Sequence, residues 1–476
     1  MAKIVPNNQQ PPRRIAAALL NQFDPQKQTL KEALPKFLAD TGERNVVMDI
    51  AFGVIRNREL IDTIIETIAD VCIDHIQKKL LTIIRIGVYE LVFTSNRAEY
   101  AIVDAAVEEA KSAGRKKAAG FVNAVLRNIH RNIKNRSVEL QKDVATVAAL
   151  SSGHATLPMP PATILLRSDG TGCEFSTAIL PDPKGNPASY LSIMFSLPTW
   201  LVEEWLSEFD FEQTRGICIA SNRRPGVYLR PNPLKTTPQQ LSDLLKSNGI
   251  DCNLIAEHKM IQLRNAGDVT QLPGFDDGLF VVQDLTASKA VKMLSPQPGW
   301  TVLDMCAAPG TKTTQLAELM ADTGTIFATD IDQTRLNRVE IAFNRLKLYS
   351  IQTIPYEKVL KTLSNMTCDA VLLDVPCSNT GVLARRPEVR YRINQSSVAE
   401  LARTQLQLLH RAAPLVRPGG KICYSTCSIQ KQENSRVVQQ FLTENNSFVL
   451  SQEQLSLPSA NTLDHDGGYA ALLQKK

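Results

Sequence analysis

Two cysteines fifty positions apart carry the clearest chemical signal in this chain of 476 residues. Cys377 follows the mainly apolar segment 372–376, and Cys427 follows the segment 423–426. We expect each cysteine to lie just beyond the end of a strand. A thiolate can form a covalent adduct with a pyrimidine ring, and a second group is then needed to help break that adduct. The pair offers a candidate for each task.

Either thiol would need a pKa below its usual value of about 8.5 to be a ready thiolate near neutrality. Cysteine is more often a small buried apolar residue than a nucleophile. That alternative fits Cys377 and Cys427 poorly, because polar residues surround both of them at the expected strand ends.

A second candidate site begins where the apolar segment 301–305 runs into a turn of small residues. The turn consists of Cys306, Ala307, Ala308, Pro309, Gly310, Thr311 and Lys312. Small residues allow a tight turn, and the free amides at the start of a helix can face a carboxylate or phosphate. Asp330 lies about 20 residues beyond the glycine, where a carboxylate can accept both hydroxyls of a ribose.

This pairing predicts an adenosine-containing cofactor, although an ordinary strand, turn and helix is an open alternative. The chain has no Gly-x-Gly-x-x-Gly motif, which disfavours a nicotinamide cofactor. It also has no Gly-Lys-Ser/Thr phosphate loop.

The elements that must position these residues alternate along the C-terminal part of the chain. We expect strands at 301–305, 325–330, 351–354, 369–374 and 420–425, with helices at 312–321, 333–346, 397–413 and 431–443. Alternation of this kind predicts a doubly wound parallel sheet that binds its ligands at the carboxyl ends of the strands.

The rest of the chain divides into regions of different residue pattern. The length of the whole chain suggests two or three domains. Apolar residues recur at helical spacing through 13–136, which predicts an all-α bundle. Proline and glycine interrupt 137–192, which resembles a linker or insertion with a small hairpin. Residues 193–285 predict a small α/β region, with helices at 199–209 and 238–247 and strands at 226–230, near 254 and at 260–264. The last domain is expected to span 286–476.

Composition places the chain among globular proteins, with 43% hydrophobic and 21% charged residues. The net charge of +5 is modest, so any polyanion must be recognised locally. The segment 111–136 holds eight Lys or Arg and no Asp or Glu, which fits a solvated helix face as well as a nucleic-acid surface.

Nine scattered cysteines form no disulfide framework, and we see neither a secretory leader nor an apolar run long enough to cross a membrane. We therefore expect a cytoplasmic protein. The six histidines are dispersed and no zinc-type cysteine spacing occurs, so no metal is predicted.

Three segments together resemble the RNA cytosine-C5 methyltransferases of the Sun/NOL/NOP family: 302–310, 374–378 and 424–428. Three further segments are similar to the NusB-like domain of the bacterial subgroup that modifies small-subunit ribosomal RNA: 52–58, 85–91 and 120–127. The resemblance leaves out roughly 137–192. It implies an N-terminal all-α NusB-like bundle, a small α/β RNA-binding region and a C-terminal Rossmann-like class I methyltransferase domain.

The resemblance implies S-adenosylmethionine as methyl donor, held by the 306–312 turn with Asp330 on its ribose. It also implies that Cys427 is the nucleophile, that Cys377 assists product release, and that Asp374 contacts both substrate and cofactor. Thiolate addition to C6 of cytosine would make C5 able to attack a sulfonium methyl group. DNA cytosine-C5 methyltransferases use a Pro-Cys cysteine as nucleophile, so the assignment rests on the Thr-Cys-Ser motif at 426–428.

Two positions depart from the family pattern. Thr311 replaces the second glycine of the turn, and a threonine is tolerated at a helix N-terminus. The usual Gly-Asp pair after the third strand is missing, and only Glu357 is available as a displaced substitute for the adenine contact.

Arginine alternates with an aromatic residue downstream of Cys377, a pattern that can contact phosphates and stack on an unpaired base. The expected RNA contacts are Arg223, Arg224, Arg230, Arg385, Arg386, Arg390 and Tyr391. A solvated loop is the alternative. We expect ribosomal RNA as partner, no obligate protein partner and a monomer. A non-catalytic RNA-binding or antitermination protein, an enzyme acting on another RNA such as tRNA, and a DNA methyltransferase remain open.

Overall fold

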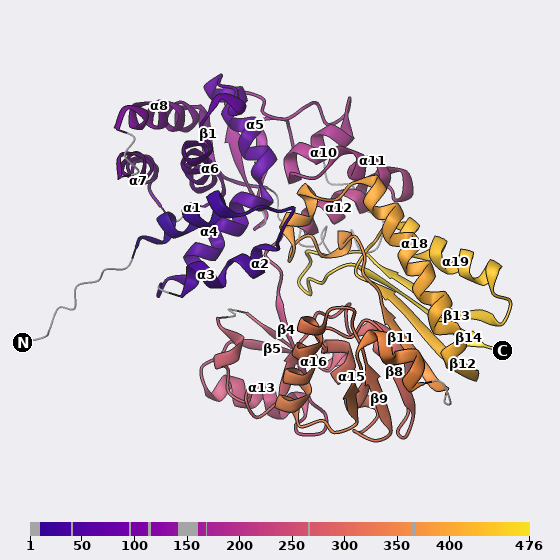
Figure 1. Cartoon of the computed structure of the whole chain (residues 1–476). Coiled ribbons are helices and arrows are strands. Elements are labelled where there is room, and N and C mark those ends of the chain that lie inside the picture. The colour runs from indigo at the N-terminus through magenta and orange to yellow at the C-terminus, as the bar shows by residue number, and fades with distance from the viewer. Residues whose placement is uncertain are drawn as a thin grey trace, which may run out of the picture. The chain divides into compact units, whose positions relative to one another are not determined.

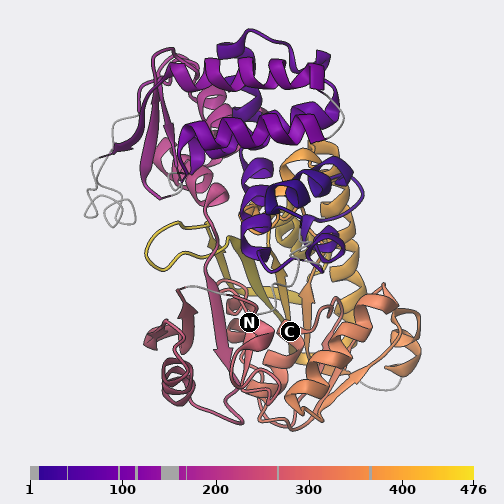
Figure 2. The same ribbon diagram turned by 90° about the vertical axis from the view of Figure 1, so that its left-hand side faces the viewer.

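The computed structural model describes residues 10–39, 41–94, 97–112, 116–140, 160–167, 169–264, 267–363 and 367–476. Their contacts divide the chain into two units. The helical unit comprises residues 1–224 and 383–392, and the α/β unit comprises residues 225–382 and 393–476. Figures 1 and 2 trace the elements of both units.

The helical unit begins with a bundle that the apolar spacing of its sequence explains. Its helices are α1 (Pro12–Gln22), α2 (Leu30–Ala33), α3 (Pro35–Leu38), α4 (Arg44–Arg56), α5 (Arg58–Ala69), α6 (Lys78–Phe93), α7 (Glu99–Ser112) and α8 (Lys116–Asn132). In α5 the buried side chains recur at intervals of three and four, which forms one apolar stripe facing the core. The prediction of helices is confirmed as far as Asn132; residues 113–115 of the basic segment lie outside the described residues.

Among the described residues, three strands and three helices follow the bundle. The strands β1 (Ile133–Glu139), β2 (Ile164–Leu166) and β3 (Thr171–Phe175) form a sheet in the order β1-β3-β2. The helices are α10 (Pro187–Phe195), α11 (Thr199–Glu208) and α12 (Phe211–Asn222). The small hairpin expected in 137–192 is the antiparallel pair β2–β3, while residues 141–159 lie outside the described residues. The predicted domain boundary near 193 stays a prediction.

A short segment from the second half of the chain also belongs to the helical unit. The chain contributes residues 383–392 to this unit and then returns to the α/β unit. Arg390 is buried there, and its guanidinium donates to backbone carbonyls of α4, α10 and α12 at 2.6, 2.9 and 3.1 Å. The hydroxyl of Tyr391 donates to another carbonyl of α4 at 2.5 Å. These contacts anchor the segment in the helical unit.

The α/β unit opens with a four-stranded antiparallel sheet in the order β5-β6-β4-β7. Its elements are β4 (Val227–Pro231), α13 (Pro238–Ser247), β5 (Cys252–Ile255), β6 (Met260–Leu263) and β7 (Phe280–Val282). Thr237 and Gln240 form a capping box that starts α13 where the sequence predicts it. The prediction missed β7.

A seven-stranded sheet follows, in the order β10-β9-β8-β11-β12-β14-β13. Its strands are β8 (Thr301–Asp304), β9 (Thr325–Ala328), β10 (Ile351–Thr353), β11 (Cys368–Asp374), β12 (Val416–Thr426), β13 (Phe448–Ser456) and β14 (Gly468–Lys475). The first five are parallel, as predicted. β14 pairs antiparallel with both β12 and β13, so the expectation of a purely parallel sheet is corrected to a mixed one.

Helices cover both faces of this sheet, and Figure 1 shows them on either side of its strands. They are α14 (Lys289–Leu294), α15 (Thr311–Leu319), α16 (Gln333–Leu346), α18 (Gln395–Ala412) and α19 (Ser435–Glu444). Leu303 and Leu373 pack with residues of α18 and α19 on one face. Their neighbours Val302 and Leu372 pack with residues of α14, α15 and α16 on the other. Alternate side chains of a strand point to opposite faces, so these strands are apolar throughout.

No helix among the described residues combines the length and the apolar character that crossing a membrane requires.

Candidate active site

The two predicted cysteine loops leave the sheet side by side. β11 and β12 are parallel neighbours, and Asp374 lies opposite Ser425 in their register. Beyond the strands, the amide of Gly381 donates to the carbonyl of Cys427 at 3.0 Å. Because both strands end at the same edge of the sheet, the loop that carries Cys377 runs beside the loop that carries Cys427.

The thiols of Cys377 and Cys427 lie within reach of each other. Their Sγ atoms are 3.2 Å apart, and both cysteines are free thiols. Cys377 is buried, whereas Cys427 is partly accessible. The hydrogen bond with Cys427, together with burial, holds the pKa of the Cys377 thiol well above its usual value. Cys377 is therefore protonated near neutral pH in this arrangement.

Asn379 connects the two thiols, although the sequence prediction did not include it. The Sγ of Cys427 donates to Asn379 Oδ1 at 3.2 Å, and Asn379 Nδ2 donates to the carbonyl of Cys377 at 2.7 Å. Asn379 has a φ of +62°, a left-handed conformation that asparagine tolerates better than most residues. Because asparagine is common in tight turns, its position directly after the Pro-Cys-Ser motif could have indicated this turn from the sequence.

Asp374 is held in place by two neighbours at the ends of adjacent elements. Lys312 Nζ lies 2.6 Å from Asp374 Oδ2, and Ser425 Oγ donates to Asp374 Oδ1 at 2.9 Å. Burial acts to lower the pKa of Lys312, but the attraction and hydrogen bond of Asp374 outweigh burial and raise it. Lys312 is thus a fixed cation that orients Asp374 beside the thiols.

A single buried carboxylate forms hydrogen bonds with both cysteine loops. Glu433 is fully buried and accepts hydrogen bonds from the Ser378 amide at 2.8 Å and from Ser428 Oγ at 2.6 Å. It also accepts from Ser378 Oγ and, at 3.0 Å, from Gln405 Nε2. Ser378 follows one cysteine and Ser428 follows the other, so one carboxylate fixes the spacing of both loops. Sequence reasoning missed Glu433 because its polar surroundings resemble an exposed helix start.

The predicted cofactor turn, 306–312, joins β8 to α15. Gly310 has a φ of +100°, and a Cβ atom there would lie 3.1 Å from the backbone of Val339 in α16. Both constraints favour glycine at this point. Thr311 is the first residue of α15, so the departure from the family pattern leaves the helix start intact.

Three carboxylates gather around this turn. Asp330 is buried, and its Oδ2 accepts from the amide of Ala308 at 3.2 Å. Asp304 accepts from a threonine hydroxyl through Oδ2, while its buried Oδ1 has no hydrogen-bond partner among the described residues. Burial raises the pKa of Asp304 to about 7. Burial, followed by the charges of Asp304, Asp374 and Asp330, raises the pKa of the Cys306 thiol.

This set of groups suits S-adenosylmethionine, which carries a sulfonium and an ammonium group. Negative side chains and an unpartnered carboxylate oxygen match those positive charges. Glu357, the residue that the sequence predicts to contact adenine, lies exposed in a short 3₁₀ helix after β10. Among the described residues, no group of His, Cys, Asp and Glu side chains is placed to hold a metal ion.

The residues predicted to contact RNA differ in burial. Arg223, Arg230 and Arg390 are buried, whereas Arg224 and Arg386 are exposed. Arg385 and Tyr391 are partly buried.

Arg230 and Arg390 have buried protein partners, and their predicted contact with RNA stays a prediction. Arg230 donates to Glu318 through Nε and Nη2, each at 2.8 Å, and also to a threonine of α15. Arg390 is enclosed by the carbonyls described above, and Arg223, the C-cap of α12, donates to a carbonyl of that helix at 2.7 Å. In this structure these guanidinium groups bind protein partners inside the fold. Arg224 forms an exposed ion pair with Asp49.

Three protein-family models match parts of this chain. Residues 291–471 match the family described as 16S rRNA methyltransferase RsmB/F, and residues 10–131 match the NusB family. Residues 197–270 match the ferredoxin-like domain of RsmF/B-like methyltransferases. A probable ribosomal RNA small subunit methyltransferase B of Synechocystis is 30% identical over 93% of this chain and 91% of its own length. The chain belongs to the RsmB/F family.

A second relative, the ribosomal RNA small subunit methyltransferase B of Proteus mirabilis, is 29% identical over 98% of both chains. Among solved structures, the protein titled PH0851 is 24% identical and superposes with a TM-score of 0.72 over 98% of this chain and 99% of its own. A methyltransferase homologue from Pyrococcus horikoshii, also 24% identical, gives 0.53 over 60% of this chain and 98% of its own. These two structures support the fold.

Membership in the RsmB/F family confirms several predictions. The protein is an S-adenosylmethionine-dependent rRNA methyltransferase with an N-terminal NusB domain, a ferredoxin-like domain and a C-terminal methyltransferase domain. The enzymatic assignment removes the alternative of a non-catalytic antitermination protein.

Proposed function

We propose that this enzyme transfers the methyl group of S-adenosylmethionine to C5 of a cytosine in 16S rRNA through a covalent adduct with Cys427. The observation that carries the proposal is the pair of thiols, 3.2 Å apart at the carboxyl ends of β11 and β12. A single thiol would suffice for addition. Two thiols at one place supply both an attacking group and a group for release.

Each side chain has one task in this scheme. The thiolate of Cys427 adds to C6, and its electron pair makes C5 nucleophilic toward the methyl group that S-adenosylmethionine supplies. Cys377 then loses its proton to water, and its thiolate takes the C5 proton; the electrons of that C–H bond restore the C5–C6 double bond and expel the Cys427 thiolate. Asp374 hydrogen-bonds the cytosine edge at N3 or N4 and stabilises the adduct.

The accessibility of the thiols supports this division of roles. Cys427 is the partly accessible thiol, as the attacking group must be. Cys377 is buried with a raised pKa, so it holds its proton while Cys427 attacks. Once the sulfur of Cys427 is bonded to C6, the hydrogen bond and charge of Cys427 no longer raise the pKa of Cys377, so Cys377 loses its proton more readily.

Other residues would hold the two substrates. The 306–312 turn, Asp330 and Glu357 would bind the cofactor, with Asp304 adding a carboxylate near its positive groups. Arg224, Arg385, Arg386 and Tyr391 stay proposed RNA contacts. An unpaired cytosine would be favoured because the base must leave its stack to reach both thiols.

Two variants test the assignment of the cysteines. Cys427→Ala should abolish both methylation and the covalent complex with RNA, because no thiolate can add to C6. Cys377→Ala should leave the protein trapped on RNA, visible as a slow band in a denaturing gel. Cys72→Ala, at an exposed cysteine in the helical unit, is the control and should behave like the wild type.

The opposite result, trapping by Cys427→Ala, would exchange the two roles. Labelled cofactor offered with 16S rRNA, tRNA and duplex DNA separates the substrate classes, and we expect label in the 16S rRNA alone.

The protein is proposed to work in the cytoplasm as a monomer. All nine cysteines are free thiols, which suits a reducing compartment. Light scattering on the purified chain would reveal any dimer.

A further inference from the structure

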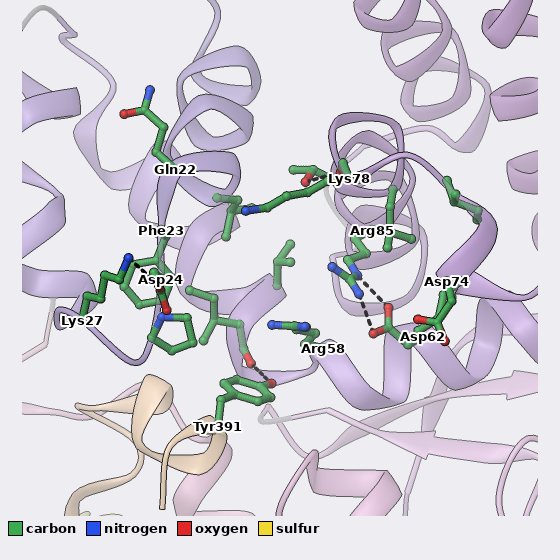
Figure 3. A pocket seen from close by; sticks show the side chains of 18 of the residues that line it. Gln22, Phe23, Asp24, Lys27, Arg58, Asp62, Asp74, Lys78, Arg85 and Tyr391 are labelled. Carbon is green, nitrogen blue, oxygen red and sulfur yellow. Dashed lines mark hydrogen bonds and ion pairs between the residues drawn. The ribbon is translucent and has the colours of Figure 1, made fainter.

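A cavity of about 710 Å³ lies in the helical unit and has no part in the chemistry described above. The end of α1 and the loop after it form one wall, and the start of α6 forms the opposite wall (Figure 3). Residues of α4 and α5, together with Tyr391, complete the lining. Its volume falls in the range of sites that hold small molecules or single nucleotides.

Arg58 brings a positive charge into this cavity, close enough to Asp62 to act on its pKa. Its guanidinium lies over the ring of Tyr391, with the central carbon 5.2 Å from the ring centroid. In the part of the chain that the structure describes, no hydrogen bond or ion pair engages this guanidinium. A planar fork of free N–H groups is the side chain best suited to a phosphate.

Tyr391 gives Arg58 a fixed support. Its hydroxyl donates to the carbonyl of Ile55, and its ring packs against the apolar cluster of α1, α2 and α4. The ring held in this way gives the guanidinium of Arg58 a defined surface to stack on. Arg58 is therefore already oriented before any ligand arrives.

Lys78 provides a second free cation from the opposite wall. It is exposed at the start of α6, and Figure 3 shows its ammonium reaching into the same hollow as Arg58. Two lining carboxylates already have partners. Asp62 forms a bidentate pair with Arg85 at 2.7 Å on each oxygen, and Asp24 pairs with a lysine at 3.6 Å.

The remaining charge balance in the cavity is positive. Asp74 is the third lining carboxylate and is exposed, so it opposes the two free cations with one negative charge. The apolar part of the lining includes Leu20, Phe23 and Ile76. The lining thus offers positive charge to an anion and apolar surface to a flat, weakly polar ring.

We propose that this cavity, named the Arg58 pocket, binds one unpaired nucleotide of the substrate RNA. The phosphate would lie on Arg58 and Lys78, and the base would lie against the apolar wall. The inference rests on the rRNA substrate of the proposed function. It gives the NusB-like domain a defined contact with single-stranded RNA, at a distinct set of residues from the cysteine loops.

RNA binding by the full-length protein without added cofactor tests the pocket. Arg58→Gln and Lys78→Gln should each weaken binding of a short unstructured RNA about five- to tenfold, because each removes a charge-assisted contact. The plot of log affinity against log salt should become shallower by about 0.7 for each variant. Lys79→Gln removes the same charge from the next residue of α6, which is exposed and does not line the cavity, and should change neither quantity.

Equal losses in Lys78→Gln and Lys79→Gln would overturn the proposal, since they would indicate only general attraction of RNA to a basic surface. Inorganic phosphate that competes as well as adenosine monophosphate would also overturn it, because the base would then contribute nothing. If Arg58→Gln unfolds the helical unit, Lys78→Gln decides alone. Methylation by the wild type, measured in parallel, shows separately whether the proposed reaction occurs.

Discussion

One buried carboxylate, Glu433, holds the loops that carry the thiols of Cys377 and Cys427. Its oxygens accept from the residue after Cys377 and from the residue after Cys427. A carboxylate inside a fold is costly unless its oxygens are satisfied, and here four donors satisfy them. The negative charge also helps to raise the pKa of Cys377. In the proposed reaction Glu433 would therefore act through position and charge rather than by contact.

Glu433→Gln should slow methyl transfer by roughly a hundredfold with little change in RNA affinity, because small displacements of reacting groups are costly. Removing the negative charge lowers the pKa of Cys377, so the pH at which adduct release becomes fast should move to lower values. Stopped assays of adduct and product across pH would measure both effects. Glu444→Gln, at an exposed glutamate of α19, should change neither.

The reactive residues were predictable from sequence because each follows a recognisable strand. Cys377, Cys427 and Asp374 come at the carboxyl ends of apolar segments, and the order of a doubly wound sheet brings such ends together. Glu433 and Asn379 were not predictable in this way, since their partners are set by the three-dimensional meeting of two loops. Whether the predicted side chains have their assigned roles stays a prediction.

At the scale of elements, strands with apolar runs were predicted well and edge strands were not. β8, β9 and β11 are largely buried and mostly apolar, and the second half of β12 is buried as well. β13 is exposed along almost its whole length and is rich in Ser, Gln and Glu, so it shows no alternation to detect. β14 is apolar, but its antiparallel direction depends on the connection from β13 and not on its own composition.

Arg230 illustrates the same limit for a side chain. Its strand, β4, was predicted, but its partner Glu318 lies in α15, eighty-eight residues later. The ion pair is buried on both sides and ties the ferredoxin-like sheet to the helix that starts at the cofactor turn. Nothing in the local sequence distinguishes such an arginine from one that faces a phosphate.

Arg230→Met should therefore destabilise the α/β unit by about 3–5 kcal/mol, because Glu318 would remain buried without its partner. Thermal unfolding and cofactor binding would measure the loss. The double variant with Glu318→Met should recover most of the stability, since an apolar pair leaves no unpaired charge. If Arg230→Met lost RNA affinity but no stability, the result would support the RNA contact that the sequence predicts for Arg230.

At the scale of the whole molecule, the chain joins its two units three times rather than once. It passes from the helical unit to the α/β unit after Arg224, returns for residues 383–392, and leaves again at Ile393. The returning segment begins directly after the 3₁₀ turn that follows the Cys377 loop. The helical unit is therefore completed by residues encoded within the methyltransferase domain, which a linear division of the sequence into domains does not reveal.

The attachment of residues 383–392 to the helical unit should depend on Arg390. Arg390→Met would leave carbonyls of three helices without a donor and should destabilise the helical unit by about 2–4 kcal/mol. Tryptophan fluorescence in a Trp300→Phe background reports this unit, because the other two tryptophans lie in α11. Its urea transition should shift to lower concentration while S-adenosylmethionine affinity stays unchanged.

Arg386→Met, at an exposed arginine of the same segment, separates structure from recognition. It should leave the urea transition in place and weaken RNA binding, the reverse of the pattern for Arg390→Met. An Arg390→Met protein of unchanged stability with weakened RNA binding would mean that its guanidinium leaves the carbonyls to meet RNA. Residues 383–392 would then bind the RNA substrate when it is present and pack in the helical unit only when RNA is absent.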